Sequence, residues 1–312
     1  MMFWDHKRIL ISGCGGFIGS ALYNQICNKK LDGQLVIGIG RRFQQRFEQL
    51  PSPSEGQYQI HCDLTDSEET AKVIAWARPE LIYHCAAKAT TKIEHSLDER
   101  QMIEQNINTT HNLLYAAHDV IVVHTSSILV WDRILHKNWE HVKYTQPNPK
   151  SMYGSTKLAQ ENIIKSCKNV KKGNIIRLSA VVGAGSSHGM LRDFIKKAQS
   201  DSSTFEIFGP GYGCEKPYIY LGEVVDYLMY KMDGATLTNN SIGAEKVAKI
   251  VMDEIGVKKE IIYNNKQFWT GDTPFIINDK SPEIKYNSEE SIRLAVRDIL
   301  EEQKIQEMIR RF

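Results

Sequence analysis

Long apolar runs and an excess of one charge are both missing from this sequence. No uninterrupted apolar stretch approaches the ~20 residues that a membrane-spanning helix needs, and the opening residues MMFWDHKR become charged before any apolar stretch forms. We therefore expect neither membrane insertion nor export. The 39 Lys and Arg nearly balance the 37 Asp and Glu, and the short basic segment KNVKKG at 168–173 is typical of a solvated helix end. Nucleic-acid binding is not expected.

A C-x-x-C motif is also missing. The six cysteines include no C-x-x-C and lie mostly in or beside apolar segments, which is typical of buried free thiols in a reducing compartment. We therefore expect a cytoplasmic protein without a zinc site. What the chain does have is 42% hydrophobic residues in 312, enough for a large core in one α/β domain or in a main domain with a smaller annex.

Short apolar runs alternate with helical patterns over the first half of the chain. Runs typical of buried strands lie at 8–12, 35–39, 58–62, 81–85, 120–124 and 174–178, with helical patterns between them at 17–27, 67–78, 99–118 and 152–168. Strands that alternate with helices indicate right-handed βαβ crossovers. The order therefore predicts an α/β fold of the Rossmann type, with a doubly wound parallel sheet.

The pattern changes after about residue 183, where a mixture of helical segments and glycine-rich turns follows. We predict two regions. The first is a dinucleotide-binding domain over 1–182, with 222–234 packing back on it, and the second is a smaller mixed substrate-binding region over 183–221 and 235–312.

A glycine loop, SGCGGFIG, follows the first predicted strand directly. Its glycines at 13, 16 and 19 stand where the chain must turn sharply, let backbone N–H groups approach a pyrophosphate and let the next helix pack closely. A glycine triplet alone is a weak signal, but this one lies between the first strand and the first helix, where the mechanism requires it. The loop therefore predicts dinucleotide binding rather than a plain turn.

The G-x-x-G-x-x-G spacing, with Phe17 and Ile18, resembles the extended short-chain dehydrogenase/reductase family. The resemblance covers most of the first 235 residues. It implies that in CDLT the Asp63 side chain lies near the adenine amino group and Leu64 lies against the ring. Asp63 could equally cap the helix predicted near residue 67.

Two later segments resemble the cofactor pocket of the same family. HCAAK resembles H-x-A-A and would place Ala86 and Ala87 beside the cofactor, and EQNINTTHNLL resembles N-x-x-G-T-x-N-L and would place Asn106 on the cofactor side. Thr109 stands where the family has glycine, which indicates somewhat different helix packing.

The end of the second strand predicts which dinucleotide is used. Gly40 stands where NAD-binding members carry aspartate, and Arg41 and Arg42 follow it. Without a carboxylate to repel a 2′-phosphate, and with two guanidiniums to pair with it, NADP(H) is favoured over NAD(H). The alternative is that both arginines are only solvated surface side chains.

The resemblance also implies the catalytic residues. HTSSILVW resembles T-S-S-x-x-V-Y-G and assigns Ser127, and PKSMYGSTK resembles P-x-S-x-Y-x-x-S-K and assigns Tyr153 and Lys157, which would also contact the cofactor. A phenol with a pKa of ~10 acts as a base near neutral pH only if a cation stabilises the phenolate, and Lys157 lies one helical turn away.

Two further tyrosines precede a lysine by four residues. Tyr212, paired with Lys216, follows a G-P-G turn, and Tyr227, paired with Lys231, lies on an amphipathic helix without the upstream motifs. For both pairs we prefer a structural role. Lys216 itself falls in a segment resembling the family's substrate region, where it could meet a substrate phosphate as a point charge.

Two residues just after Ser127 restrict which reactions are expected. Ile128 and Leu129 stand where the family's sugar-nucleotide 4,6-dehydratases carry an acidic pair, so dehydration is not expected. We predict 4-keto reduction or 4-hydroxyl oxidation of a nucleotide-linked sugar. The alternatives are a 4-epimerase with tightly bound NAD, a reductase of a non-sugar carbonyl and a non-catalytic NADP-sensing regulatory protein. The resemblance further implies a homodimer formed through two helices of each subunit.

Overall fold

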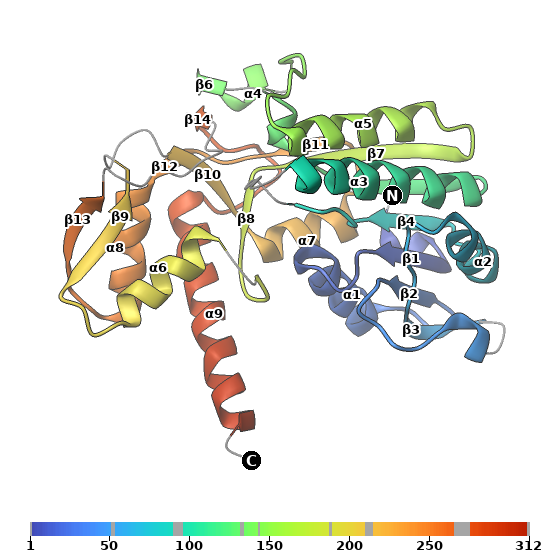
Figure 1. Ribbon diagram of the computed structural model, residues 1–312, viewed down its shortest axis with the longest axis horizontal. Coiled ribbons are helices and arrows are strands. Elements are labelled where there is room, and N and C mark those ends of the chain that lie inside the picture. Colours follow the sequence, from blue (N-terminus) through green and yellow to red (C-terminus); the bar gives the residue numbers. More distant parts are fainter. Residues whose placement is uncertain are drawn as a thin grey trace. The chain divides into compact units, whose positions relative to one another are not determined.

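The computed structural model describes residues 2–50, 54–89, 96–131, 134–142, 144–186, 189–209, 215–264 and 275–310 (Figure 1). The chain divides into two compact units. Unit 1 comprises Met1–Asp132, Pro147–Arg177 and Val225–Thr236, and unit 2 comprises Arg133–Gln146, Leu178–Val224 and Leu237–Phe312. These units differ from the predicted domains mainly because residues 133–146 and 178–182 belong to unit 2.

The central sheet confirms the predicted fold class. Among the described residues it has seven strands in the order β11-β7-β5-β4-β1-β2-β3. The strands are β1 (Arg8–Ser12), β2 (Leu35–Ile39), β3 (Gly56–Ile60), β4 (Leu81–His84), β5 (Val120–Ser127), β7 (Val170–Leu178) and β11 (Ala235–Leu237). The pairs from β3 through β2, β1 and β4 to β5 are parallel. The strand order reverses between β1 and β4, which is where open sheets of this kind bind ligands.

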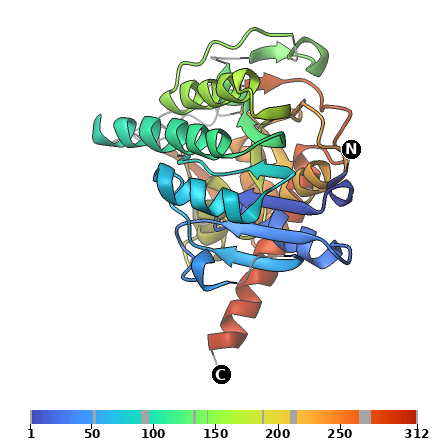
Figure 2. The same ribbon diagram turned by 90° about the vertical axis from the view of Figure 1, so that its right-hand side faces the viewer.

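Helices cover both faces of the sheet in unit 1, which explains why its central strands are buried almost throughout. On one face α2 (Ser67–Ala77) contacts α3 (Ser96–Ala116), which lies beside α5 (Met152–Ser166) (Figures 1 and 2). On the other, α1 (Phe17–Lys29) approaches the end of α7 (Leu221–Tyr230), where Lys29 donates to the Tyr230 hydroxyl at 2.7 Å. The buried interior between the sheet and helices α2, α3 and α5 is mainly aliphatic.

Unit 2 has a mixed structure of small sheets and helices. Its strands form the sheets β12-β10-β8, β13-β9 and β14-β6. The strands are β6 (Ile134–Lys137), β8 (Ala180–Val182), β9 (Thr204–Phe208), β10 (Glu215–Tyr220), β12 (Ser241–Gly243), β13 (Glu260–Asn264) and β14 (Phe275–Ile277). Helices α6 (Met190–Gln199), α8 (Ala244–Ile255) and α9 (Ser288–Arg310) enclose a core around Phe194, Phe205 and Val247.

Short helices complete the chain: η1 (Phe3–Asp5), η2 (Phe47–Gln49), η3 (Ile128–Val130) and α4 (Trp139–Val142). Of these, η3 matters for the site because it continues directly from β5. No helix within the described ranges is long and apolar enough to cross a membrane.

Candidate active site

The glycine loop between β1 and α1 packs directly on neighbouring backbone. Gly13 has φ +70°, and a Cβ there would lie 2.7 Å from the backbone N and Cα of Ala86. A Cβ on Gly19 would lie 2.9 Å from the carbonyl carbon of Gly13, and Gly16 N donates to Gly13 O at 2.8 Å. Because no side chain fits at Gly13 or Gly19 without moving backbone, the loop meets the requirement for close approach that its sequence predicted.

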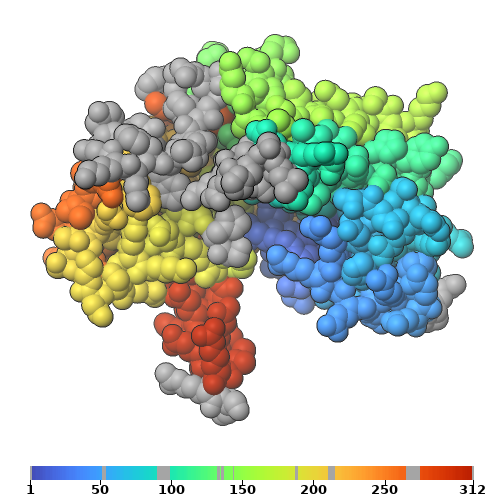
Figure 3. Space-filling model, in the orientation of Figure 1, coloured from blue at the N-terminus to red at the C-terminus, as the bar shows by residue number. Residues whose placement is uncertain are grey.

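A cavity of about 430 Å³ opens beside this loop, within unit 1. Its volume lies in the usual range for small-molecule sites. Of the predicted cofactor residues, the cavity is lined by Gly13, Gly16, Arg41, Arg42, Asp63, Leu64, Ala86, Ala87 and Asn106. On the face of unit 1 shown in Figure 3, the N-terminal strands and helices (blue) and α3 (teal) adjoin at the surface.

Some predicted residues do not line this cavity, and others that do were missed. Phe17, Ile18 and Gly19 form the first turn of α1, and Ser127, Tyr153 and Lys157 lie on β5 and α5. Sequence analysis named Gly40 and Thr109 for their places in the motifs but not as cofactor residues. It did not assign the other lining residues, which are Gly15, Cys62, Thr65, Cys85, Lys88 and Gln105. Most of these residues are sequence neighbours of residues that were assigned. Their position next to an assigned motif was therefore the available signal.

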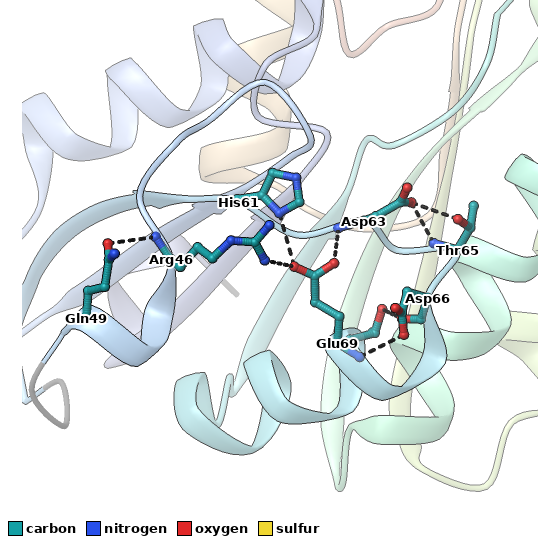
Figure 4. Close-up of polar contacts among 8 residues, drawn as sticks. Arg46, Gln49, His61, Asp63, Thr65, Asp66 and Glu69 are labelled. Atoms are coloured by element: carbon teal, nitrogen blue, oxygen red, sulfur yellow. Dashed lines mark hydrogen bonds and ion pairs between the residues drawn. The ribbon is translucent and has the colours of Figure 1, made fainter.

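Asp63 does not cap α2. Its carboxylate accepts from Thr65 N at 3.0 Å and from Thr65 Oγ1 at 2.8 Å, whereas Asp66 caps the helix by accepting from Glu68 N and Glu69 N (Figure 4). The capping alternative for Asp63 was therefore wrong. The reason is that the chain makes a further turn after Asp63 before the helix begins.

Glu69 holds the backbone at this edge of the cavity. One carboxylate oxygen accepts from Asp63 N at 2.9 Å, and the other contacts Arg46 Nη1 at 3.2 Å and His61 Nδ1 at 3.0 Å (Figure 4). The strand end that carries Asp63 is thus tied to α2 and to the segment after β2. Sequence reasoning missed Glu69, because its partners come from two separate segments, one after β2 and one after β3.

Arg41 and Arg42 lie at the cavity rim, and both are exposed. Arg42 Nη1 donates to Gly15 O at 3.2 Å, so this side chain lies over the glycine loop. The end of β2 has room for a small side chain, since a Cβ on Gly40 would meet the Phe43 ring at 3.4 Å and Gly15 N at 3.6 Å.

Helix α5 presents the tyrosine and the lysine. Ser151 caps the helix by accepting from Gly154 N at 3.0 Å, which explains why the helix begins just before Tyr153. Lys157 is only 2% exposed, and its Nζ donates to Thr125 O at 2.8 Å. The same Nζ lies 5.9 Å from the centroid of the Tyr153 ring. The two residues are therefore brought together as the spacing predicted.

Burial dominates the protonation of both residues. It lowers the pKa of Lys157 to about 8, although Cys85 and Glu161 act in the opposite direction. It raises the pKa of Tyr153 above the ordinary value of a phenol. The ammonium of Lys157 therefore does not by itself make Tyr153 a base near neutral pH, and further positive charge is needed at this point.

Ser127 ends β5 and is 9% exposed. Its Oγ accepts from Leu129 N at 3.1 Å and so caps η3, which leaves the hydroxyl proton available for donation. Helix α5 packs so closely on η3 that no side chain fits at Gly154, since a Cβ there would lie 2.8 Å from the carbonyl carbon of Leu129. This contact brings the strand end that carries Ser127 to the start of the helix that carries Tyr153.

We expect Gly154→Ala to lower the free energy of unfolding by about 1–3 kcal/mol, because backbone must move to admit the methyl group. Thermal melts measure this loss. Gly234→Ala is the matched control within unit 1, since its Cβ would meet only Ile175 atoms at 3.5 Å or more. Equal melting temperatures for the two variants would contradict the tight contact.

Asn106 is completely buried between the cavity and α5. Its Oδ1 accepts from Lys88 N at 2.7 Å, and its Nδ2 donates to Lys88 O at 3.2 Å and to Thr156 Oγ1 at 3.0 Å. The side chain therefore links the segment after β4 to the helix of Tyr153. Thr109, which stands where the family has glycine, lines the cavity.

The remaining tyrosine–lysine pairs differ from the first. Tyr212 lies outside the described residues, and Lys216 lies on β10 in unit 2, opposite Ile242. Tyr227 is buried, and its hydroxyl donates to Asp233 O at 3.1 Å. Lys231 Nζ lies 5.7 Å from the Tyr227 ring centroid. The Tyr227 hydroxyl is thus used in a local backbone contact.

Comparison with known proteins assigns the chain to a family. Residues 9–239 match the NAD dependent epimerase/dehydratase family. The UDP-glucose 4-epimerase of Mycolicibacterium smegmatis is 28% identical over 232 residues, which are 70% of this chain and 71% of the relative. Methionine adenosyltransferase 2 subunit beta of Danio rerio is 25% identical over 167 residues, which are 53% of this chain. The matched segment spans only 46% of that relative, about half its length.

Solved structures share the fold over nearly the whole chain. A UDP-glucose 4-epimerase of Thermotoga maritima, solved with UDP-glucose, has a TM-score of 0.76 at 20% identity and covers 95% of this chain and 99% of its own. A UDP-glucose 4-epimerase of Thermus thermophilus, solved with NAD, has a TM-score of 0.70 at 21% identity. The match covers 93% of this chain and 98% of the Thermus chain. At these identities the likeness shows the fold alone.

Proposed function

The chain belongs to the NAD dependent epimerase/dehydratase family, and from this premise we propose that it is an NADP(H)-preferring oxidoreductase acting on a nucleotide-linked sugar. The reaction is 4-keto reduction or, in reverse, 4-hydroxyl oxidation. Support for the substrate class comes from the relatives named as nucleotide-sugar epimerases. Support for the chemistry comes from the residues on β5 and α5.

One observation carries the proposal: a buried lysine beside a tyrosine. Lys157 is 2% exposed and its pKa is lowered to about 8 by burial, so an ammonium here destabilises the fold. A residue that only supported the fold would not need to be ionisable. Perturbed ionisable groups of this kind cluster at functional sites.

The residues divide the chemistry between them. In oxidation, Tyr153 as phenolate takes the proton of the 4-hydroxyl group, and in reduction it returns that proton to the 4-keto oxygen. Ser127 donates its hydroxyl proton to the same substrate oxygen. Lys157 stabilises the phenolate. A bound nicotinamide dinucleotide supplies the hydride acceptor or donor and, when oxidised, a positive ring charge that favours the phenolate.

The lining of the cavity in unit 1 supports the proposal of a bound dinucleotide. Gly13, Gly15 and Gly16 of the glycine loop line the cavity just before the N-terminus of α1, a position that suits a pyrophosphate. Arg41 and Arg42 at the rim suit a 2′-phosphate, since guanidiniums form charge-assisted hydrogen bonds to phosphate.

We expect Gly40→Asp to reverse the cofactor preference. A carboxylate at the end of β2 repels a 2′-phosphate and accepts from a 2′-hydroxyl. The ratio of kcat/KM for NADP(H) to that for NAD(H) should fall about 10- to 100-fold, the equivalent of the roughly 1.5–3 kcal/mol of a hydrogen bond to a charged group. Steady-state kinetics with both cofactors measure this. Gly243→Asp, in unit 2, adds the same charge elsewhere and should not change the ratio. A wild type that prefers NAD(H) contradicts the proposal.

The function is tested by incubating the purified protein with a panel of nucleotide sugars and 4-keto nucleotide sugars, with each cofactor, and following cofactor oxidation state and product stereochemistry. Turnover that consumes NADPH supports the reductase. Interconversion of 4-epimers without net cofactor consumption, together with NAD retained through purification, supports the 4-epimerase instead. If neither cofactor chemistry nor epimerisation is detected with any nucleotide sugar, the proposed function is wrong.

A second candidate is a non-catalytic, dinucleotide-binding regulatory subunit. It is favoured by the match to a relative named as a subunit of methionine adenosyltransferase. Binding of NADP(H) without turnover, unaffected by substitution of Tyr153, distinguishes this candidate from the enzyme.

The assembly we propose is a cytoplasmic homodimer formed through α3 and α5, which lie side by side in unit 1 (Figures 1 and 2). The exposed side chains of Ile103 and Tyr115 on α3 are available for such a contact. Sedimentation velocity of the wild type and of Ile103→Glu tests it.

A further inference from the structure

Helix α5 contacts the end of β5 and η3 at three successive places. Gly154 packs on Leu129 O, Lys157 Nζ donates to Thr125 O at 2.8 Å, and Glu161 accepts from Ser126 Oγ at 2.7 Å. The helix positions 154, 157 and 161 are three and four residues apart, so they share one face of α5. The last of these contacts involves neither a predicted catalytic residue nor the cofactor cavity.

Glu161 is a completely buried carboxylate with donors from two other elements. Besides Ser126 on β5, Arg177 on β7 donates Nε to Oε1 at 2.9 Å and Nη2 to Oε2 at 2.7 Å. The Arg177 guanidinium also lies 4.9 Å from the Trp131 ring centroid. Burial opposes ionisation, but the hydrogen bonds from Arg177 and Ser126 outweigh it and lower the pKa of Glu161. The group is therefore an ionised carboxylate with both oxygens engaged.

Cohesion of the fold does not require this arrangement. Apolar side chains of similar volume would hold two strands and a helix together without the desolvation cost of a buried ion pair. A bidentate pair differs from apolar packing because it fixes direction as well as distance. What it fixes here is Ser126, the neighbour of Ser127, against the helix turn that follows Lys157.

We propose that Glu161, oriented by Arg177, is a positioning residue that holds the end of β5 against α5 and so sets Ser127 relative to Tyr153 and Lys157. This inference rests on the proposed function. It extends that function, because it assigns a role in turnover to a carboxylate that touches neither the cofactor cavity nor the proposed reacting groups.

The charge of Glu161 also supports the ammonium of Lys157. Burial keeps the neighbouring histidines neutral, since it lowers the pKa of His84 to about 3 and that of His124 far below its ordinary value. Burial likewise raises the pKa of the Cys85 thiol to about 12. The groups that act on or face Lys157 are His84, Cys85, His124, Tyr153 and Glu161. Of these five, Glu161 carries the negative charge near neutral pH.

Ser126→Ala and Glu161→Gln test the two contributions separately. Ser126→Ala removes one hydrogen bond but leaves the Glu161–Arg177 pair intact, so the protein should fold. We expect kcat to fall about 10-fold or more, because small displacements of reacting groups are costly, with the NADP(H) dissociation constant unchanged. The alkaline limb of its pH–kcat profile should stay in place. Glu161→Gln should lower kcat and also move that limb to lower pH.

Glu254→Gln is the matched control. It removes a carboxylate paired with Arg293 and Arg297 in unit 2 and should alter neither kcat nor the pH profile. A Ser126→Ala protein that folds and keeps the wild-type kcat overturns the inference.

A second measurement does not depend on turnover. Hydrogen exchange followed by mass spectrometry should show faster exchange over residues 125–131 in Ser126→Ala and no change over 8–19. An unchanged exchange rate over 125–131 overturns the inference. If the wild type itself shows no turnover, the proposed function fails, and this exchange measurement still decides whether Ser126 and Glu161 hold the strand end.

Discussion

Tyr153→Phe is expected to lower turnover about 10²–10⁴-fold, the range that a positioned acid–base group contributes. The substitution removes one hydroxyl group from a half-buried ring and leaves the capped start of α5 intact. The affinity for NADP(H) and the melting temperature should therefore stay near the wild-type values. Initial rates with the best nucleotide sugar, fluorescence titration with NADPH and thermal melts measure the three quantities.

Tyr227→Phe is a matched control, because Tyr227 also precedes a lysine by four residues and its hydroxyl donates to a backbone oxygen, Asp233 O. We expect wild-type turnover from it. If Tyr153→Phe turns over as fast as the wild type, Tyr153 is not the acid–base group. If neither wild type nor variant turns over but both bind NADP(H), the regulatory subunit is the better description.

Lys157→Met is expected to lower turnover about 100-fold or more without destabilising the protein. The phenolate of Tyr153 loses its cation, and burial already raises the pKa of that phenol. The lysine in turn costs stability, since lowering its pKa from 10.5 to about 8 corresponds to roughly 3–4 kcal/mol at ~1.4 kcal/mol per unit. The variant also loses the hydrogen bond to Thr125 O, which offsets about 1 kcal/mol of the stability gained by removing the buried ammonium.

The pH dependence of stability has a definite sign. The pKa of Lys157 is lower in the folded protein than in the unfolded chain, so between about pH 8 and pH 10.5 the unfolded chain binds more protons. This group therefore contributes a stability that rises with pH across that window. Denaturant unfolding at several pH values measures this effect. The free energy of unfolding of the wild type should increase relative to that of Lys157→Met as the pH rises. A variant that melts well below wild type at neutral pH would instead make Lys157 a structural residue.

Much of the fold could be predicted because its signals are local. The strand β1, the glycine loop and the start of α1 are consecutive, and apolar runs of buried parallel strands are continuous. Where neighbouring residues compete for one role, local pattern was insufficient. Asp63 and Asp66 are both suitable caps, and the path of the chain selected Asp66. The short elements η3, β6 and α4 were not predicted, since each has only three or four residues.

The candidate site divides in the same way. The sequence alone predicted the loop around Gly13, the serine at the end of β5 and the pair Tyr153 and Lys157, because each motif consists of a few adjacent residues. The roles of Glu69, Gly154 and Glu161 came only from tertiary structure. Ser126 and Glu161 are 35 residues apart in the chain and Arg177 is another 16 away, so only folding makes them partners. The raised pKa of Tyr153 is likewise a consequence of burial, which depends on packing around the ring and not on its sequence neighbours.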